Sequence, residues 1–221
     1  KLYEVKGEKI KKLSIKNEKQ AQELKEEIFS STFSISEIES KIRKNNPYPP
    51  FITSTLQLDA SNKLGFSPSR TMSLAQKLYE GININGENKG LITYMRTDST
   101  NLSNQFIQEA KNIIVKNFGD NYVYNSVRTF KNKVKNSQEA HEAIRPSDPS
   151  IKPNELPSSL EQDLKKLYDL IWRRSLSTQA SQSVSKIISI KVANKSNSII
   201  LTASTSELQF DGYKKIYQDE E

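Results

Sequence analysis

The period of the hydrophobic pattern changes along this chain, and that change constrains the fold more than any other feature. Near the C-terminus, Ile188, Ile190 and Val192 alternate with polar residues, as in a half-buried strand. The polar turn NKSNS then leads to a second strand-like run, IILTAST. Near the N-terminus, LYEVKGEKIKKLSI predicts a hairpin that turns at KGE, residues 6–8. Both ends of the chain therefore predict β-structure.

The middle of the chain has the period of helices instead. Apolar residues recur at helical spacing in ITSTLQLDASNKLGFSPSRTMSLAQKLYEG, which predicts helices over residues 53–64 and 69–80. Gly65 separates the two helices, and Gly81 ends the second.

These two patterns together predict an α+β fold. Residues 1–50 and 181–221 would form one β-rich domain, interrupted by a mostly helical domain of residues 51–180. Insertions of this kind are tolerated because the two ends of a domain tend to lie close together. The stretch RKNNPYPP, with three prolines, would link the two domains.

Local signals mark further boundaries. Asn17 is a suitable N-cap for a helix, and strand-like alternation returns from Phe33. Ser103 can cap a helix that ends near Gly119, and Ser158 begins a capping box. The core stripe expected beyond that box consists of Leu160, Leu164, Leu167 and Ile171.

Two helices followed by a strand are the anatomy of a helix-turn-helix in a winged-helix-like domain. In the second helix, Met72, Ala75, Leu78 and Tyr79 would face inward. The side chains left for solvent or DNA phosphate are those of Arg70, Gln76 and Lys77. An ordinary αα-hairpin has the same spacing and is the commoner arrangement.

Composition restricts the class of protein. The 221 residues include 33 Lys+Arg and 26 Asp+Glu, which gives a net charge of +7 and favours an anionic partner only modestly. With no cysteine and one histidine, a zinc site has few possible ligands. No apolar run approaches the roughly 18 residues of a membrane span, and the N-terminus has no signal-peptide core. We expect a cytoplasmic, metal-poor protein that does not enter a membrane.

The stretch GLITYMRTDST, residues 90–100, carries the chemistry of greatest interest. If it is a strand, Tyr94 and Arg96 project from one face together with Ile92 and Asp98. A tyrosine hydroxyl could then attack phosphorus while the guanidinium holds the phosphate oxygens. The common alternative is a half-buried tyrosine beside an exposed arginine.

Electrostatics limits what Arg96 could do for such a nucleophile. Ionising a free tyrosine at pH 7 costs about 4 kcal/mol. A positive charge about 6.5 Å away returns at most about 2.5 kcal/mol at an effective dielectric constant near 20. Arg96 would therefore orient phosphate and stabilise developing charge, and another group would take the proton.

The single histidine lies in SQEAHEAIRPSDP, which we interpret as a short helical turn stopped by Pro146. On a helix, His141 and Arg145 would share a face and could bind phosphate or relay a proton. A surface histidine on a frayed turn is equally consistent with this stretch.

Three stretches in this order, PYPPFITSTLQLDASNKLGFSPSRTMSLAQKLYEG, GLITYMRTDSTNLS and HEAIRPS, resemble the central part of bacterial type IA DNA topoisomerase I. The resemblance is strong over residues 46–149 and weaker to the end, where LQFDGYKKIY is similar to the family's return into its β-rich domain. The topoisomerase III branch usually has Pro at the position of Met95 and His at that of Glu142, so this chain follows the topoisomerase I pattern.

The resemblance implies a role for each residue. Tyr94 would cut one DNA strand and hold its 5′ end as a phosphotyrosine, Arg96 would contact the scissile phosphate, and His141 would assist proton movement or DNA positioning. It also implies that the β-rich ends are a hinge domain and that the partners are single-stranded and negatively supercoiled DNA and the enzyme's other domains. The reaction would need no ATP.

The family's Mg²⁺-binding acidic cluster and its zinc ribbons have no counterpart in this sequence. We find no DxD pattern, so the chain itself is expected to bind no metal, and Mg²⁺ would bind in an N-terminal domain that this fragment lacks. The fragment alone is expected to bind single-stranded DNA weakly and to leave supercoils unrelaxed.

Two other classes of DNA-binding protein share parts of this pattern. A basic winged-helix module without catalysis explains the charge and the helix pair, but it gives Tyr94, Arg96 and His141 no shared purpose. A tyrosine recombinase normally places its nucleophile after an HxxR motif. Here Tyr94 precedes HEAIR, in which the spacing is HxxxR, so we reject that class.

Overall fold

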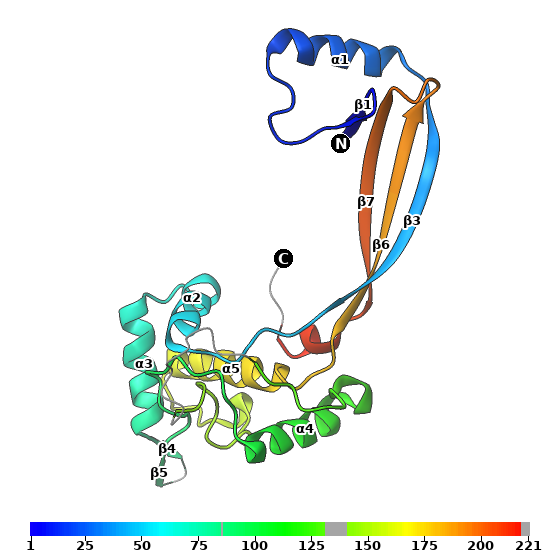
Figure 1. The fold of residues 1–221 in the computed structure, drawn as a ribbon. Helices are drawn as coiled ribbons and strands as arrows, with labels where there is room; N and C mark the ends of the chain where they lie inside the picture. Colours follow the sequence, from blue (N-terminus) through cyan, green and yellow to red (C-terminus); the bar gives the residue numbers. More distant parts are fainter. Residues whose placement is uncertain (85, 131–140, 218–221) are drawn as a thin grey trace. The chain divides into compact units, whose positions relative to one another are not determined.

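The computed structural model describes residues 1–84, 86–130 and 141–217, and the chain divides into two compact units (Figure 1). The first unit comprises Lys1–Lys44 and Val184–Phe210. The second comprises Asn45–Ser183 and the described residues from Asp211 on. Helices and an antiparallel sheet are both present, so the α+β prediction is confirmed.

The first unit is a five-stranded sheet built from both ends of the chain, in the order β2-β1-β7-β6-β3. Its strands are β1 (Leu2–Val5), β2 (Glu8–Lys9), β3 (Phe33–Asn45), β6 (Ser183–Asn194) and β7 (Ile199–Phe210). β6 and β7 pair antiparallel along most of their length, and Figure 1 shows this long hairpin running beside β3. The strands predicted near the C-terminus are therefore present, with the polar turn between them.

The predicted N-terminal hairpin is confirmed. Val5 pairs with Glu8, so only Lys6 and Gly7 form the turn. Their φ angles are 49° and 83°, which is the left-handed backbone of the two-residue turns that match strand twist. Glycine adopts this conformation without strain, and this explains its place in the loop.

Helix α1 (Glu18–Ser30) begins where the sequence predicts. The side chain of Asn17 accepts a hydrogen bond of 2.9 Å from the amide of Gln20, as expected of an N-cap. No residue of this helix is fully buried, and Phe29 is 81% exposed. The first unit thus has little core of its own around the helix.

The second unit is mostly helical. Its main helices are α2 (Thr53–Leu64), α3 (Pro68–Glu80), α4 (Asn104–Phe118) and α5 (Gln162–Ser177). A short hairpin, β4 (Ile82–Ile84) with β5 (Glu87–Lys89), follows α3. The 3₁₀ helices are η1 (Asp120–Tyr122), η2 (Pro153–Glu155) and η3 (Gly212–Lys215). The helices predicted over residues 53–64 and 69–80 are confirmed to within one residue.

Helix α5 lies in the core of this unit, where Leu167, Tyr168 and Ile171 are completely buried. Its predicted start is wrong, because α5 begins at Gln162 after Glu161, which makes no side-chain cap. The residues from 158 to 160 form turns instead of a capping box.

A buried ion pair ties α5 to α2. The guanidinium of Arg174 donates to Asp59 Oδ2 at 3.1 Å and to the carbonyl of Pro49 at 2.7 Å, and its side chain is only 7% exposed. The hydroxyl of Tyr217 donates to the same Asp59 oxygen. Three aromatic rings surround the guanidinium within about 5 Å of its carbon, those of Tyr48, Phe51 and Tyr217.

The last described residues were predicted in the β-rich domain, and this part of the prediction is wrong. Residues from Asp211 on belong to the helical unit. The physical reason is burial, because Tyr213 and Tyr217 are almost completely enclosed in that unit's core. Gly212 supports this route, since its φ is 53° and an added Cβ would lie 2.3 Å from the carbonyl oxygen of Gln182.

Candidate functional site

The stretch around Tyr94 is not a strand, so that prediction is wrong. Its only bridge to another described segment joins Ile92 and Pro146. The other backbone bonds go to segments that no strand pairing would bring together. Leu91 donates to Leu78 at the end of α3, and Thr53 at the start of α2 donates to Thr97. The segment therefore runs between helices, with partners on both sides.

Burial nevertheless alternates from residue 94 to residue 99. Three exposed side chains alternate with three buried ones: Tyr94, Arg96 and Asp98 against Met95, Thr97 and Ser99. Tyr94 is 39% exposed. Ile92 departs from the expected pattern, because it is buried at 2% exposure. The alternation thus presents the tyrosine and the arginine to solvent without a sheet.

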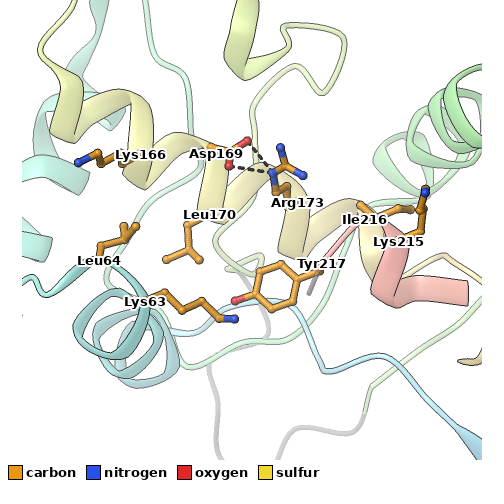
Figure 2. A pocket seen from close by; sticks show the side chains of 9 residues that line it. All are labelled: Lys63, Leu64, Lys166, Asp169, Leu170, Arg173, Lys215, Ile216 and Tyr217. Carbon is orange, nitrogen blue, oxygen red and sulfur yellow. Dashed lines mark hydrogen bonds and ion pairs between the residues drawn. The ribbon is translucent and has the colours of Figure 1, made fainter. Parts of the chain in front are cut away.

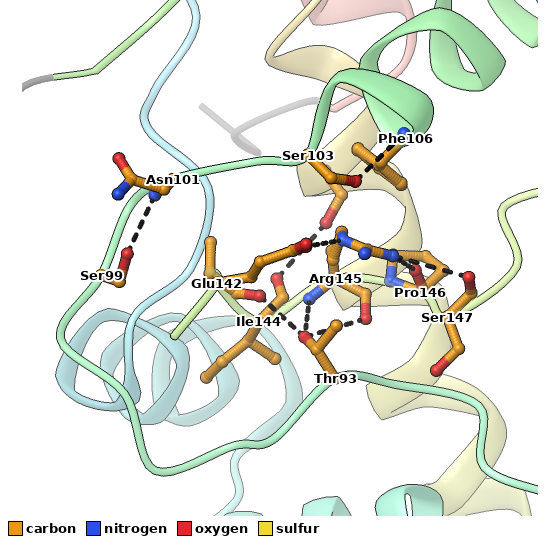
Figure 3. Close-up of polar contacts among 12 residues, drawn as sticks. Thr93, Ser99, Asn101, Ser103, Phe106, Glu142, Ile144, Arg145, Pro146 and Ser147 are labelled. Atoms are coloured by element: carbon orange, nitrogen blue, oxygen red, sulfur yellow. Dashed lines mark hydrogen bonds and ion pairs between the residues drawn. The ribbon is translucent and has the colours of Figure 1, made fainter. Parts of the chain in front are cut away.

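Thr93 fixes the chain just before the tyrosine (Figure 3). Its hydroxyl donates to the carbonyl of Ala143 at 2.7 Å and accepts from the amide of Arg145 at 3.0 Å. Its own amide donates to the carbonyl of Arg145 at 2.9 Å. These bonds bring the segment after His141 next to the segment that carries Tyr94.

Thr53 fixes the chain just after the tyrosine. Its hydroxyl donates to the carbonyl of Met95 at 2.8 Å and lies 3.1 Å from that of Thr97. The amide of Thr97 donates back to the same hydroxyl at 3.0 Å, and the amide of Thr53 donates to the carbonyl of Thr97 at 2.9 Å. Tyr94 thus lies between two threonine contacts.

Three aromatic rings form a row at this point. The ring centroids of Tyr79 and Tyr94 are 5.3 Å apart, with an edge-to-face angle of 65°. Those of Tyr94 and His141 are 6.1 Å apart and tilted by 39°. Tyr79 was expected to face inward, but it is 41% exposed, so that expectation is wrong. The row brings the only histidine to the tyrosine.

An open groove of about 770 Å³ lies beside this row. Its described lining comprises Ile52, Thr53, Ser54, Gln57, Arg96, Thr97, Asp98 and His141. Within the described part of the chain, the guanidinium of Arg96 and the imidazole of His141 have no hydrogen-bond or ion-pair partner. Both groups are therefore available to a ligand that enters the groove.

Arg145 does not share a helical face with His141. Residues 141–145 contain no helix, and Ile144 forms a bridge with Phe51. The guanidinium of Arg145 donates to Glu142 at 2.5 Å and to the carbonyl of Pro146 at 2.8 Å (Figure 3). Its side chain is 13% exposed and already satisfied, and its part in DNA binding stays a prediction.

The polar residues predicted on the outer face of α3 have protein partners. Arg70 pairs with Asp163, and Gln76 donates to Glu80. Lys77 pairs with Glu161 at 3.3 Å. DNA would compete with these carboxylates, so the three contacts also stay predictions.

A second pocket, of about 360 Å³, lies at the other end of α2 (Figure 2). Its cationic lining residues are Lys63, Lys166, Arg173 and Lys215. Arg173 is bound to Asp169 at 2.8 Å, and Lys63 lies 4.9 Å from the ring centre of Tyr217. Residues 52–57 line the first groove and residues 63–64 line this pocket, so the length of the helix separates them.

No metal centre is found in residues 1–84, 86–130 and 141–217, because no three His, Cys, Asp or Glu side chains come together there. These residues therefore do not fit a magnesium ion held by a carboxylate cluster. Among the same residues, no helix has both the length and the apolar character needed to cross a membrane.

The sequence predicted no part in the site for Thr53, Thr93 or Tyr79. A threonine near the start of a helix and a tyrosine in a helical apolar stripe both have ordinary local explanations. The one available signal was the TST stretch of residues 53–55, which offers more hydroxyls than a single cap needs.

The chain was compared with known proteins. Residues 2–221 match the DNA topoisomerase family. The chain is 47% identical to DNA topoisomerase 1 of Rickettsia felis over 99% of its own length and 28% of that protein. It is 44% identical to DNA topoisomerase 1 of Campylobacter jejuni, again over 99% of the chain, and covers 31% of that protein.

A solved structure agrees with these sequence matches. Full-length topoisomerase I from Thermotoga maritima superposes with a TM-score of 0.77 at 38% identity, over 91% of this chain and 32% of that one. The chain thus spans about a third or less of the relatives that it matches. Both the sequence and the fold assign it to one family: the chain belongs to the bacterial DNA topoisomerase I family and matches a part of its relatives' length.

Proposed function

We propose that this chain is the tyrosine-bearing part of a type IA topoisomerase that relaxes negatively supercoiled DNA. The observation that supports this most is that Arg96 and His141 line one open groove and that the ring of Tyr94 lies beside that of His141. His141 is distant in the sequence from Tyr94 and Arg96, yet the fold brings it beside the tyrosine and into the groove that Arg96 lines. A noncatalytic winged-helix module would not require that arrangement.

The proposed reaction is a reversible transesterification. The hydroxyl oxygen of Tyr94 bonds to phosphorus, the bond from phosphorus to the 3′ oxygen breaks, and the 3′ oxygen leaves with a proton. The 5′ end then remains on the tyrosine. Because the reverse attack of the 3′ hydroxyl restores both starting bonds, resealing needs no ATP.

Each neighbouring group has a part in that reaction. The guanidinium of Arg96, which has no partner among the residues that the structure describes, would bind the nonbridging phosphate oxygens and stabilise the charge of the transition state. The imidazole of His141, whose ring lies next to that of Tyr94, would move the proton or hold the DNA.

The rest of the enzyme completes this proposal. Mg²⁺ would bind in another domain of the full-length protein. Single-stranded and negatively supercoiled DNA would be the substrates, in the cytoplasm. The first unit would act as a hinge, and α2, α3 and the β4–β5 hairpin would form the winged-helix-like core.

Plasmid relaxation by the full-length protein tests the proposal. Tyr94→Phe is expected to bind DNA and to leave supercoils unrelaxed, because the phenol oxygen is the nucleophile. Relaxation by Tyr94→Phe would contradict the proposal. The fragment alone, with Mg²⁺, is expected to bind single-stranded DNA weakly and to relax nothing. If the full-length wild type and Tyr94→Phe bind DNA with the same affinity and neither cleaves it, the noncatalytic module is favoured.

A further inference from the structure

We propose that Thr53 is a positioning residue for Tyr94, acting on the backbone just after the tyrosine. The inference rests on the proposed role of Tyr94 as the nucleophile. Thr53 is the first residue of α2, so it would connect the start of that helix to the direction of the phenol.

The amide and the hydroxyl of Thr53 both bond to one short segment. Its amide donates to the carbonyl of Thr97, and its hydroxyl donates to the carbonyl of Met95 with Thr97 as a weaker second acceptor. A hydroxyl has one proton and two lone pairs, and here a lone pair accepts the amide of Thr97. The hydroxyl therefore uses both its proton and a lone pair on residues 95–97.

Ordinary helix capping does not explain this pattern. The N-cap residue of α2 is Ile52, whose side chain makes no capping hydrogen bond. The hydroxyl of Thr55 accepts the amide of Ile52 at 3.0 Å, so Thr55 serves the first turn. The hydroxyl of Thr53 instead bonds to Met95 and Thr97, and it makes no hydrogen bond to α2 among the described residues.

The contact is well placed to control the nucleophile. Within the described residues, the backbone of Tyr94 itself makes no hydrogen bond. The chain is held before it by Thr93 and after it by Thr53. Removal of the Thr53 hydroxyl would leave only the bond from the Thr53 amide to the carbonyl of Thr97 on the far side of Tyr94, and the carbonyl of Met95 would lose its donor. A displacement of about 1 Å can cost on the order of 100-fold in rate when in-line attack is required.

The same contact forms part of the groove wall. Thr53 and Thr97 line the groove together with Arg96 and His141. The Thr53 contact therefore positions the backbone next to Tyr94 relative to the start of α2 and to the side chains that would hold the phosphate. Its expected effect is on the rate of cleavage and resealing, while DNA affinity depends on the other groups of the groove.

The test uses three variants of the full-length protein. Thr53→Val keeps the shape of the side chain and removes the hydroxyl, and Thr53→Ser keeps the hydroxyl. Thr71→Val is the matched control, since Thr71 is buried in the same unit and its hydroxyl donates to the carbonyl of Ser67, the N-cap residue of its own helix. Each protein is measured for single-turnover cleavage of a single-stranded oligonucleotide, for its Kd for that DNA, and for unfolding by urea.

We expect Thr53→Val to cleave about 10-fold to 100-fold more slowly, with a Kd within about 2-fold of the wild type. Thr53→Ser should restore most of the rate, and Thr71→Val should cleave at the wild-type rate. Equal losses of rate in Thr53→Val and Thr71→Val that follow their losses of stability would overturn the proposal, as would a Thr53→Ser variant as slow as Thr53→Val.

Tyr94→Phe, measured alongside, separates this inference from the proposed function. If Tyr94→Phe is inactive and Thr53→Val cleaves at the wild-type rate, only the positioning role fails. If Tyr94→Phe still cleaves, the proposed function itself fails.

Discussion

The ring of Tyr94 lies 6.1 Å from that of His141, the only histidine in the chain. The bonds of Thr93 to the backbone of residues 143–145 hold the two segments together. Arg96 lines the same groove as His141, and Tyr94 lies beside His141, so a phosphate bound there would lie near a nucleophile, a fixed positive charge and a group that can carry a proton.

Arg96→Lys tests whether the shape of the guanidinium matters beyond its charge. The substitution keeps the positive charge but removes the paired donors that match phosphate oxygens. We expect DNA affinity close to that of the wild type and cleavage slower by about 10-fold to 100-fold, measured on a single-stranded oligonucleotide. A wild-type rate for Arg96→Lys would show that charge alone is sufficient at this position.

His141→Gln tests the proton-transfer role. Glutamine can still donate a hydrogen bond to DNA, but it cannot exchange a proton, and general acid–base catalysis typically contributes about 100-fold or more. We expect cleavage slower by about 10-fold to 100-fold with DNA affinity close to that of the wild type, as measured by quenched-flow sampling. If the variant cleaves at the wild-type rate, His141 does not move the proton.

Arg174→Met tests the buried ion pair in the helical unit. Loss of the guanidinium leaves Asp59 half-buried with one hydroxyl donor, and breaking a buried pair costs about 3–5 kcal/mol. We expect a loss of that order in the free energy of unfolding by urea. Arg173→Met is the adjacent control, because its pair with Asp169 is largely exposed and should contribute about 0.5 kcal/mol or less. Similar losses in both variants would contradict this account.

Alkaline pH is expected to destabilise the fold through two tyrosines. Burial raises the pKa of Tyr168 well above the usual range for tyrosine, and the nearby Asp148 adds to the effect. Burial and the hydrogen bond to Asp59 likewise raise the pKa of Tyr217. Both phenols stay neutral in the fold at pH values where the unfolded chain ionises, so the free energy of unfolding should be constant below about pH 10 and fall above it.

Urea unfolding between pH 8 and 11.5 checks this prediction. Tyr168→Phe removes one of the two titrating groups, together with the hydrogen bond of 2.8 Å from its hydroxyl to the carbonyl of Ile151. The variant should be less stable at pH 8 and should lose less stability between pH 10 and 11.5 than the wild type. An identical slope in both proteins would show that Tyr168 does not titrate as its burial requires.

Local signals predicted the elements whose ends are set by nearby residues. The left-handed turn at Lys6-Gly7, the cap at Asn17 and the helix break at Gly65 each depend on a few neighbours in the sequence. Ser103 likewise caps α4 through the amide of Phe106. Such features could be predicted because the interaction and its signal lie within the same short stretch.

The site could be predicted in its residues but not in its geometry. The motifs identified Tyr94, Arg96 and His141, yet the strand and the helical turn assigned to them were wrong. The backbone bonds that hold the residues flanking Tyr94 and Arg96 go to the start of α2, the end of α3 and residues 143–147, and these partners are distant in the sequence. The side chains of residues 94–99 alternate between exposed and buried, and a sequence with that alternation predicts a strand even where no neighbouring strand pairs with it. Thr53 was missed for the same reason, since its partners lie 42 and 44 positions away.

Covalent capture of DNA by the full-length protein tests the central claim most directly. A single-stranded oligonucleotide labelled at its 3′ end would be incubated with the protein, the mixture denatured, and the labelled peptide identified by mass spectrometry. We predict that the label from the 3′ side of the break remains on the peptide that contains Tyr94, and that Tyr94→Phe captures none. Retention of a 5′-terminal label, or capture through another residue, would contradict the account.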